Sequence, residues 1–283
     1  MLNYSTIQLL RFKFSYFLMP VYWFALSFVP HINRAHAVLV FIILHVLVYP
    51  SSNGYNSYMD RDEGSIGGLE KPMQPTKQLF YITVLMDVLA LLLSCFISSF
   101  FTIGLLIYIV FSRMYSYRGI RLKRFAVLGY LTVILNQGTL VFLLVYHGSG
   151  QNLSTVFPWQ GWVAAAFLIG GFYPITQVYQ HKADAGDGVK TISMLLGKRG
   201  TFIFCGIMYA IAFALLYHYF SAKNQLLQFL ILQIFFIPVI VVFTQWMLAV
   251  WKDEKEASFK RMMHMNIVAG TCTSLAFITL LIL

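Results

Sequence analysis

The sequence predicts an all-α, polytopic membrane protein with nine transmembrane helices around a central cavity. Two observations point to this class. Of the 283 residues, 59% are hydrophobic and only 11% are charged, and the mean hydropathy is +0.73. Soluble domains carry about 25% charged residues, so a soluble enzyme of this composition would expose much of its apolar surface. We therefore expect a single transmembrane domain over residues 1–283.

Nine apolar runs are the candidate spanning helices, since about 20 apolar residues cross a bilayer. They are Phe14–Val29, Ala35–Ser52, Leu79–Ile97, Phe100–Phe111, Phe125–Tyr146, Trp162–Tyr179, Thr201–Phe220, Leu226–Trp251 and Ile267–Leu283. The third and fourth are divided at Ser98 and Ser99, because one helix over both would be too long for the bilayer. The fourth is short unless it extends through Arg113 to Tyr117.

The positive charges fall almost entirely on one side of a membrane that the chain crosses nine times. Alternate connections, starting from the N-terminus, hold all but two of the 20 Lys and Arg residues, the exceptions being Arg34 and Lys223. Lys and Arg concentrate in cytoplasmic loops, so we expect a cytoplasmic N-terminus and an external C-terminus. This spread of the net charge of +10 argues against nucleic-acid binding, which would gather it on one surface.

The few acidic residues cluster on the same predicted side. Asn53, Asn56 and Asp60 are spaced i, i+3, i+7, and they share one helical face if the second helix continues through them. The sixth helix is expected to end in a similar stripe. Its members are Gln177, Gln180, His181, Asp184 and Asp187.

Two facing, oxygen-rich stripes suit Mg²⁺, which binds through one or two carboxylates together with substrate phosphates. The stripes could hold Mg²⁺ ions that bridge a diphosphate, and nearby cations could grip the same phosphates. Those cations are Arg118, Arg121, Lys123 and Arg124. The ordinary alternative is that these polar residues simply face water. The glycine-rich run 64–68 is either a phosphate cradle or a flexible turn.

At these residues the chain resembles the UbiA superfamily of intramembrane prenyltransferases. Asn56-Ser-Tyr-Met-Asp60 is similar to the first aspartate motif of the family, in the loop region 53–71. The segment "QHKADAGDGVKTISMLLG" of this chain, which starts within the region 177–191, is similar to the family's second aspartate motif. Gly188, Thr191 and Gly197 keep the frame of that motif. "YSYRGIRLKRFAVLG" is similar to the family's loop between the fourth and fifth helices. Two expected acids are replaced, by Gly64 and Gln180, and Asp62 or Glu63 could substitute for the first.

The resemblance implies a set of site residues around Mg²⁺ and an isoprenyl diphosphate. Asp60 and Asp184 would be catalytic, and the metal ligands would be Asn56, Asp60, Asp62 and Asp184. The diphosphate would contact Asn53, Tyr115, Tyr117, Arg121, Lys123, Gln180 and Lys190, with the register of the two tyrosines left open. Inside the fifth helix, Asn136 and Gln137 face the cavity or a neighbouring helix. Asp87 is the only acid within an apolar run, and no partner for it is evident.

The leading hypothesis is a prenyltransferase that transfers an isoprenyl chain to an aromatic or lipophilic acceptor. The alternative is a terpene cyclase of the same superfamily, which needs no acceptor and which the altered motifs favour. A non-enzymatic lipid-binding or transport protein is a third possibility. We expect the protein in the bilayer of a bacterial inner membrane, with its active site open to the cytoplasm and no nucleic-acid partner.

Overall fold

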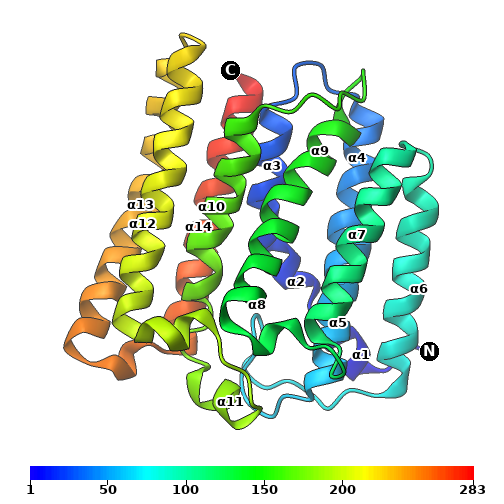
Figure 1. The fold of residues 1–283 in the computed structure, drawn as a ribbon, viewed down its shortest axis with the longest axis vertical. Helices are drawn as coiled ribbons and strands as arrows, with labels where there is room; N and C mark the ends of the chain where they lie inside the picture. The colour runs from blue at the N-terminus through cyan, green and yellow to red at the C-terminus, as the bar shows by residue number, and fades with distance from the viewer.

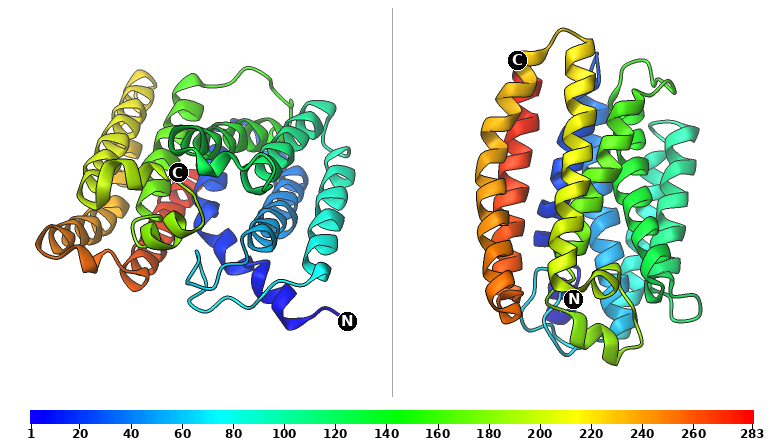
Figure 2. Two further views of the ribbon diagram at one scale, coloured as in Figure 1. Left: turned by 60° about the horizontal axis from the view of Figure 1, so that its bottom comes forward. Right: turned by 60° about the vertical axis from the view of Figure 1, so that its left-hand side comes forward.

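The structure is a computed structural model that describes all of residues 1–283, and it consists of helices joined by loops, without a β-strand. Most of the helices run side by side along the long axis of the molecule (Figure 1). The two termini lie at opposite ends of this bundle (Figure 1). Helices α12 and α13 form one side of the bundle and α6 the other (Figures 1 and 2). The all-α prediction is therefore confirmed.

Fourteen α-helices and five shorter 3₁₀- or π-helical segments make up the chain. They are α1 (Tyr4–Leu9), α2 (Phe12–Ser15), η1 (Tyr16–Leu18), α3 (Met19–Ser27), α4 (Arg34–Phe41), η2 (Ile42–Val48), α5 (Tyr49–Asp60), α6 (Lys77–Ser94), α7 (Ser99–Ser116), η3 (Leu122–Arg124), α8 (Ala126–Val133), η4 (Ile134–Leu140), α9 (Val141–Ser149), α10 (Trp159–Ile175), α11 (His181–Gly186), α12 (Ile192–Ala222), α13 (Leu226–Lys252), η5 (Glu254–Glu256) and α14 (Phe259–Ile282).

Seven helices are long and apolar enough to cross a membrane. Two of them are composite, since α4, η2 and α5 form one helix over Arg34–Asp60, and α8, η4 and α9 form another over Ala126–Ser149. The other two predicted crossings correspond to α10, of 17 residues, and to the broken segment α2–α3. The protein is thus polytopic, and the count of nine crossings remains a prediction.

Polar residues fix where several helices begin and bend. The Ser98 side chain accepts a hydrogen bond from Phe101 N–H at 3.1 Å, which caps α7 and separates it from α6 where the sequence predicted. α12 changes direction at Gly197, whose φ of +67° lies in the left-handed region that favours glycine. The first apolar run is also interrupted, because the 3₁₀ segment η1 lies between α2 and α3, which starts at Met19.

A single large core joins the two sides of the bundle. Phe24 of α3 is fully buried and packs against Phe142 of α9 and Phe277 of α14, at ring distances of 5.3 and 4.7 Å. The outer faces are also apolar. Exposed residues on α6 and α13 include Leu85, Val88, Leu92, Leu230, Ile234 and Ile237. Exposed apolar surface on this scale is expected of helices that face lipid.

Candidate active site

The polar residues at the end of α5 and those that follow α10 line one cavity of about 230 Å³. The second predicted helix does continue to Asp60, so its stripe of polar residues occupies one helical face. The cavity lies toward the end of the bundle where α5 ends and α11 lies (Figure 1). Of the predicted site residues, those that line it are Asn53, Asn56, Asp60, Asp62, Tyr115, Lys123, Asn136, Gln180 and Asp184.

The carboxylate of Asp60 is enclosed, with its side chain only 4% exposed. Asn56 donates one hydrogen bond to Asp60 Oδ2, at 2.9 Å, and another to Ser116 Oγ at 3.0 Å. The ammonium of Lys123 forms an ion pair with the same carboxylate. Asn56 therefore orients Asp60, and Lys123 neutralises it.

The basic segment after α7 ties the end of α5 to α11. Arg118 donates from Nε to the carbonyl oxygen of Met59 at 2.7 Å. The Arg121 guanidinium forms an ion pair with Asp187, and its Nη2 lies 3.5 Å from Asp60 Oδ1. Arg121 does not line the cavity, because its guanidinium is turned toward these two carboxylates. Its contacts support a role in holding acidic residues in place.

The expected polar stripe on the sixth helix is wrong in its geometry. α10 ends at Ile175, and a turn over residues 176–180 separates it from the short helix α11. Gln177, Gln180 and Asp184 still reach the cavity. His181 does not, and its Nε2 lies 2.7 Å from Ser193 Oγ instead. Gln180 donates from Nε2 to the carbonyl of Ser65 at 3.3 Å, which links the two motif loops.

Pro174 gives the physical reason why α10 ends early. A proline has no N–H, so the carbonyl of Gly170, one turn earlier, loses its helical donor. The Tyr130 hydroxyl donates to that carbonyl at 3.3 Å. Thr176 then donates back to the carbonyl of Tyr173 at 2.7 Å, a local bond that competes with further helix.

The carboxyl groups of Asp62 and Asp184 have too little positive charge around them to keep their pKa values in the ordinary range. Burial raises the pKa of Asp184 to about 6, against the pull of Lys123, and the nearby Asp62 and Asp60 raise it further. Burial, followed by the charge of Asp60, also raises the pKa of Asp62. An additional cation between these side chains would favour their ionised forms.

The structure distinguishes the two tyrosines between which the sequence left the register open. Tyr115 lines the cavity, and its hydroxyl shares a hydrogen bond with that of Tyr173. Tyr117 is 49% exposed and lies outside the cavity. Lys190 is also exposed and does not line the cavity, although its backbone N–H donates to the Arg124 carbonyl at 3.2 Å. Tyr117 and Lys190 are therefore not placed to contact a ligand there.

Asn136 lies in η4, a π-helical segment in the middle of the fifth predicted crossing. Its side-chain amide donates to the carbonyl of Tyr108 on α7 at 3.0 Å, and the residue also lines the cavity. The two roles that the sequence left open for Asn136 are thus both realised. π-Helical turns are frequent at functional sites.

Sequence reasoning missed the partner of Asp87. Arg113 lies inside α7, so the fourth predicted helix does extend through it. Its guanidinium forms a largely buried ion pair with Asp87 of α6. The same guanidinium donates to Ser51 Oγ at 3.0 Å and to Thr83 Oγ1 at 3.2 Å, and it lies 4.0 Å from the ring centre of Tyr55. α5, α6 and α7 are thereby joined, and residue spacing within one helix carries no information about such a contact between helices.

Arg11 and Ser116 are among the cavity residues that the sequence analysis did not single out. Arg11 precedes the first apolar run, where a basic residue is ordinary at a membrane surface. Ser116 is the last residue of α7 and carries no charge. Neither residue type nor spacing distinguishes them from their neighbours.

The oxygen atoms around the cavity fit Mg²⁺. Asn56, Asp60, Asp62 and Asp184 are the side chains that could hold the ion. The buried Oε1 of Gln177 has no hydrogen-bond partner and lies in the same lining. No group of three or more His, Cys, Asp and Glu side chains forms a protein-only metal site. Mg²⁺ completes its shell with water and substrate phosphates, so one or two carboxylates are enough to bind it.

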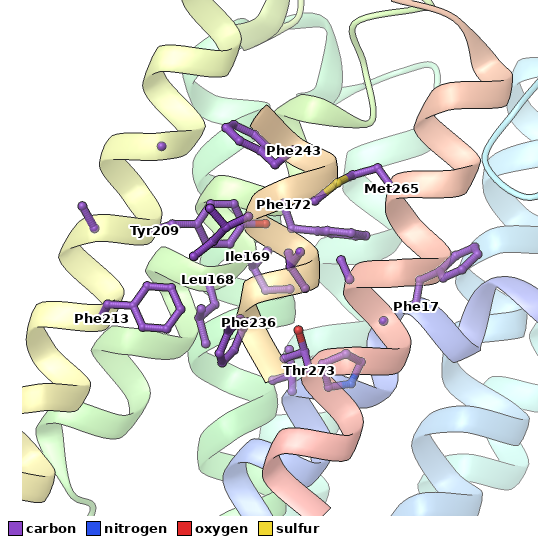
Figure 3. A pocket seen from close by; sticks show the side chains of 18 of the residues that line it. Phe17, Leu168, Ile169, Phe172, Tyr209, Phe213, Phe236, Phe243, Met265 and Thr273 are labelled. Atoms are coloured by element: carbon purple, nitrogen blue, oxygen red, sulfur yellow. The ribbon is translucent and has the colours of Figure 1, made fainter. Parts of the chain in front are cut away.

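A second, apolar cavity of about 380 Å³ lies beside the polar one. Figure 3 shows side chains of α10, α12, α13 and α14 that point into it, with Phe172 among them. Ile169 and Phe172 line both cavities and so form the partition between them. Rings also come from Phe17, Tyr209, Phe213, Phe236, Phe243 and Phe277. A polar site thus opens beside an apolar, aromatic chamber.

Comparisons with known proteins agree with this architecture. The model of the UbiA prenyltransferase family matches residues 17–268. No curated protein matches the chain.

Solved structures of low sequence identity share the fold over almost the whole chain. A UbiA homologue from Archaeoglobus fulgidus bound to DMAPP and Mg²⁺ is 19% identical, with a TM-score of 0.72 over 99% of this chain and 100% of that chain. An apo UbiA homologue from Aeropyrum pernix K1 is 16% identical, with a TM-score of 0.67 over 94% and 98%. A structure of digeranylgeranylglyceryl phosphate synthase is 20% identical, with a TM-score of 0.61 over 97% and 96%.

Proposed function

Since this chain belongs to the UbiA prenyltransferase family, we propose that it is a Mg²⁺-dependent intramembrane prenyltransferase. It ionises an isoprenyl diphosphate and transfers the prenyl group to an aromatic or lipophilic acceptor. One observation carries the proposal: a cavity lined by carboxylates and a lysine adjoins an apolar cavity of about 380 Å³. An isoprenyl diphosphate has the same two parts, a charged head and an apolar chain. The relative from Archaeoglobus fulgidus, with DMAPP and Mg²⁺ bound, supports the assignment.

The reaction begins with cleavage of the allylic carbon–oxygen bond, whose electron pair stays on the diphosphate. Asn56, Asp60, Asp62 and Asp184 would hold Mg²⁺, which would supply Lewis acidity toward the diphosphate oxygens. Lys123 stabilises the negative charge that develops on the leaving group, because its ammonium already lies in the cavity wall beside Asp60. Tyr115 and Gln180 lie in the same wall and orient the head group.

The allyl cation that remains must be protected from water. Ile169 and Phe172 lie where the polar cavity adjoins the apolar one, so the chain extends past them into surroundings that exclude water. An aromatic face stabilises a nearby cation by about 0.5–2 kcal/mol. Phe172 is the ring of the apolar cavity that also borders the polar one, which supports this role for it.

We also propose how the protein lies in the membrane. Nine crossings follow if α10 and the α2–α3 segment each span the bilayer, and the opposite positions of the two termini agree with an odd number (Figure 1). The loops expected at the end of the bundle with the polar cavity carry most of the Lys and Arg residues, which supports a cytoplasmic position for that end. We propose the bacterial inner membrane as the location of the enzyme.

A terpene cyclase is the second candidate, and the apolar cavity favours it. Its aromatic lining could fold the chain of a substrate whose own double bond attacks the cation. Such a reaction needs no acceptor. The replacement of two family acids by Gly64 and Gln180 marks the chain as divergent and fits either chemistry.

The purified full-length protein in detergent tests both candidates. It would be incubated with Mg²⁺ and isoprenyl diphosphates of increasing length, with and without aromatic acceptors and membrane lipid extract. Pyrophosphate release and the organic products would be measured. Turnover that requires an acceptor supports the transferase, and a cyclic terpene formed from the diphosphate alone supports the cyclase.

Matched variants connect the activity to the site. Asp60→Asn and Asp184→Asn should each reduce turnover by about 100-fold or more, because each removes a carboxylate that would hold the Mg²⁺ needed to stabilise the leaving group. Glu70→Gln is the control, since Glu70 is an exposed acid in the loop after α5 and does not line the cavity. Full activity of either aspartate variant would refute the proposed site.

A further inference from the structure

Arg11 stands out among the cations at the polar end of the molecule. It lies between α1 and α2, is only 8% exposed, and with Lys123 is one of two cationic residues in the wall of the polar cavity. Its backbone has a φ of +49°, in the left-handed region that non-glycine residues rarely adopt. The chain thus turns sharply at Arg11 and sends its side chain beneath α5.

The charge of Arg11 has no carboxylate partner. Lys123 is paired with Asp60, and Arg121 is paired with Asp187. Arg11 forms no ion pair; its Nη1 donates to the carbonyl of Gly67 at 3.2 Å and its Nη2 to that of Asn53 at 3.1 Å. Its Nε is buried and has no hydrogen-bond partner. A buried guanidinium without a counter-ion indicates an anion that is supplied from outside the chain.

Arg11 keeps its charge in this position. Burial lowers its pKa to about 10, with nearby Asp62, then Tyr179 and Asp60, opposing the shift. The guanidinium is therefore protonated at neutral pH. The two carbonyl bonds fix its plane, since they hold both Nη atoms and leave the remaining N–H groups free for a ligand.

We propose that Arg11 binds the diphosphate group of the substrate directly and stabilises it as it leaves. This rests on the proposed function, of which it names an additional head-group ligand from the N-terminal segment. When the allylic carbon–oxygen bond breaks, the electron pair remains on the diphosphate oxygen, and Arg11 compensates that charge without a proton transfer. Planar guanidinium groups are well suited to phosphate oxygens.

The alternative role of Arg11 is purely structural. Its two carbonyl bonds connect the N-terminal segment with α5 and with the loop that carries Gly67. A structural clamp would change the stability of the protein, and it would leave the affinity for a small phosphate ligand unaffected. Inorganic pyrophosphate is therefore the probe that separates the two roles.

The experiment measures pyrophosphate binding by calorimetry, in the presence of Mg²⁺, to the purified full-length protein and three variants. Arg11→Gln should weaken binding by about 10- to 100-fold, as expected for the loss of a hydrogen bond to a charged group. Arg11→Lys should recover part of the affinity, because it keeps the charge and loses the fork. Lys13→Gln removes the same charge from an exposed position two residues away and should bind like the wild type.

Thermal unfolding of each variant without ligand accompanies the binding measurement. If Arg11→Gln does not fold, the comparison of Arg11→Lys with the wild type replaces it. Equal pyrophosphate affinity in the wild type and in the folded Arg11 variants would overturn the proposal. Arg11-dependent binding of pyrophosphate by a protein that turns over no isoprenyl diphosphate would overturn the proposed function and keep Arg11 only as a ligand of a diphosphate group.

Discussion

Replacing Arg113 with Met should strongly destabilise the protein, because it would strand a charge inside the helix bundle. The side chains of Arg113 and Asp87 are 20% and 12% exposed. The guanidinium also provides hydrogen bonds to Ser51 at 3.0 Å and Thr83 at 3.2 Å. Breaking a buried ion pair by removal of one partner lowers the free energy of unfolding by about 3–5 kcal/mol.

A double-mutant cycle turns this into a measurement. Arg113→Met, Asp87→Leu and the double variant would be unfolded in detergent with a denaturant, and their free energies of unfolding compared. The double variant should be more stable than Arg113→Met alone, since no charge is left without a partner. The reasoning is refuted if Arg113→Met loses less than about 1 kcal/mol, the range of exposed ion pairs, or if the two single effects add.

Three further predictions concern the two cavities. Phe172→Ala should raise kcat/KM for longer isoprenyl diphosphates relative to shorter ones, because it opens the partition between the cavities. Phe213 lines only the apolar cavity, so Phe213→Ala is the comparison. An unchanged dependence of kcat/KM on chain length in Phe172→Ala would contradict the prediction. Since a carboxylate must lose its proton to bind a metal, the raised pKa of Asp184, about 6, should weaken Mg²⁺ binding about tenfold at pH 5 relative to pH 7; titration calorimetry at the two pH values should show it, and Asp184→Asn should flatten it. Lys123→Met removes the cation paired with Asp60, so KM for the diphosphate should rise while Mg²⁺ binds more tightly; a parallel loss of both affinities would indicate a merely structural lysine.

Apolar run length predicted where helices lie better than where they end. α14 starts at Phe259, well before the predicted Ile267, and α12 begins with a short stretch from Ile192 to the break at Gly197, just before the predicted Thr201. Hydropathy detects the part of a helix that lies in lipid, and these helices begin with polar turns such as that around Lys260. The side chains of Ser258 and Thr191 accept hydrogen bonds from backbone N–H groups and cap the first turns of α14 and α12.

The site was predictable to the extent that its residues lie on regular helix. Asn53, Asn56 and Asp60 share a face because α5 continues unbroken to Asp60. The second cluster did not follow the same rule, because Pro174 and a turn replace the expected helix. Arg11 could not be predicted at all, since it reaches the cavity through a left-handed backbone turn that has no sequence signal in an arginine.

The two replaced family acids are not equivalent, and the structure predicts which one matters. Gln180 lines the polar cavity, whereas Gly64 lies in the exposed part of the loop after α5, outside the lining. A Cβ at Gly64 would meet no atom within 4 Å, so Gly64→Asp should fold normally and leave Mg²⁺ affinity unchanged.

Gln180→Glu places a carboxylate in the cavity and removes the hydrogen bond that the Gln180 amide donates to the Ser65 carbonyl. The added negative charge should tighten Mg²⁺ binding several-fold and raise the pKa of Asp184 further in the metal-free protein. Calorimetric titration of Mg²⁺ into the two variants, in the presence of pyrophosphate, would compare them directly. Tighter binding by Gly64→Asp than by Gln180→Glu would mean that the loop closes over the cavity when ligand binds, and that the position of Gly64 described here is not the one in the working enzyme.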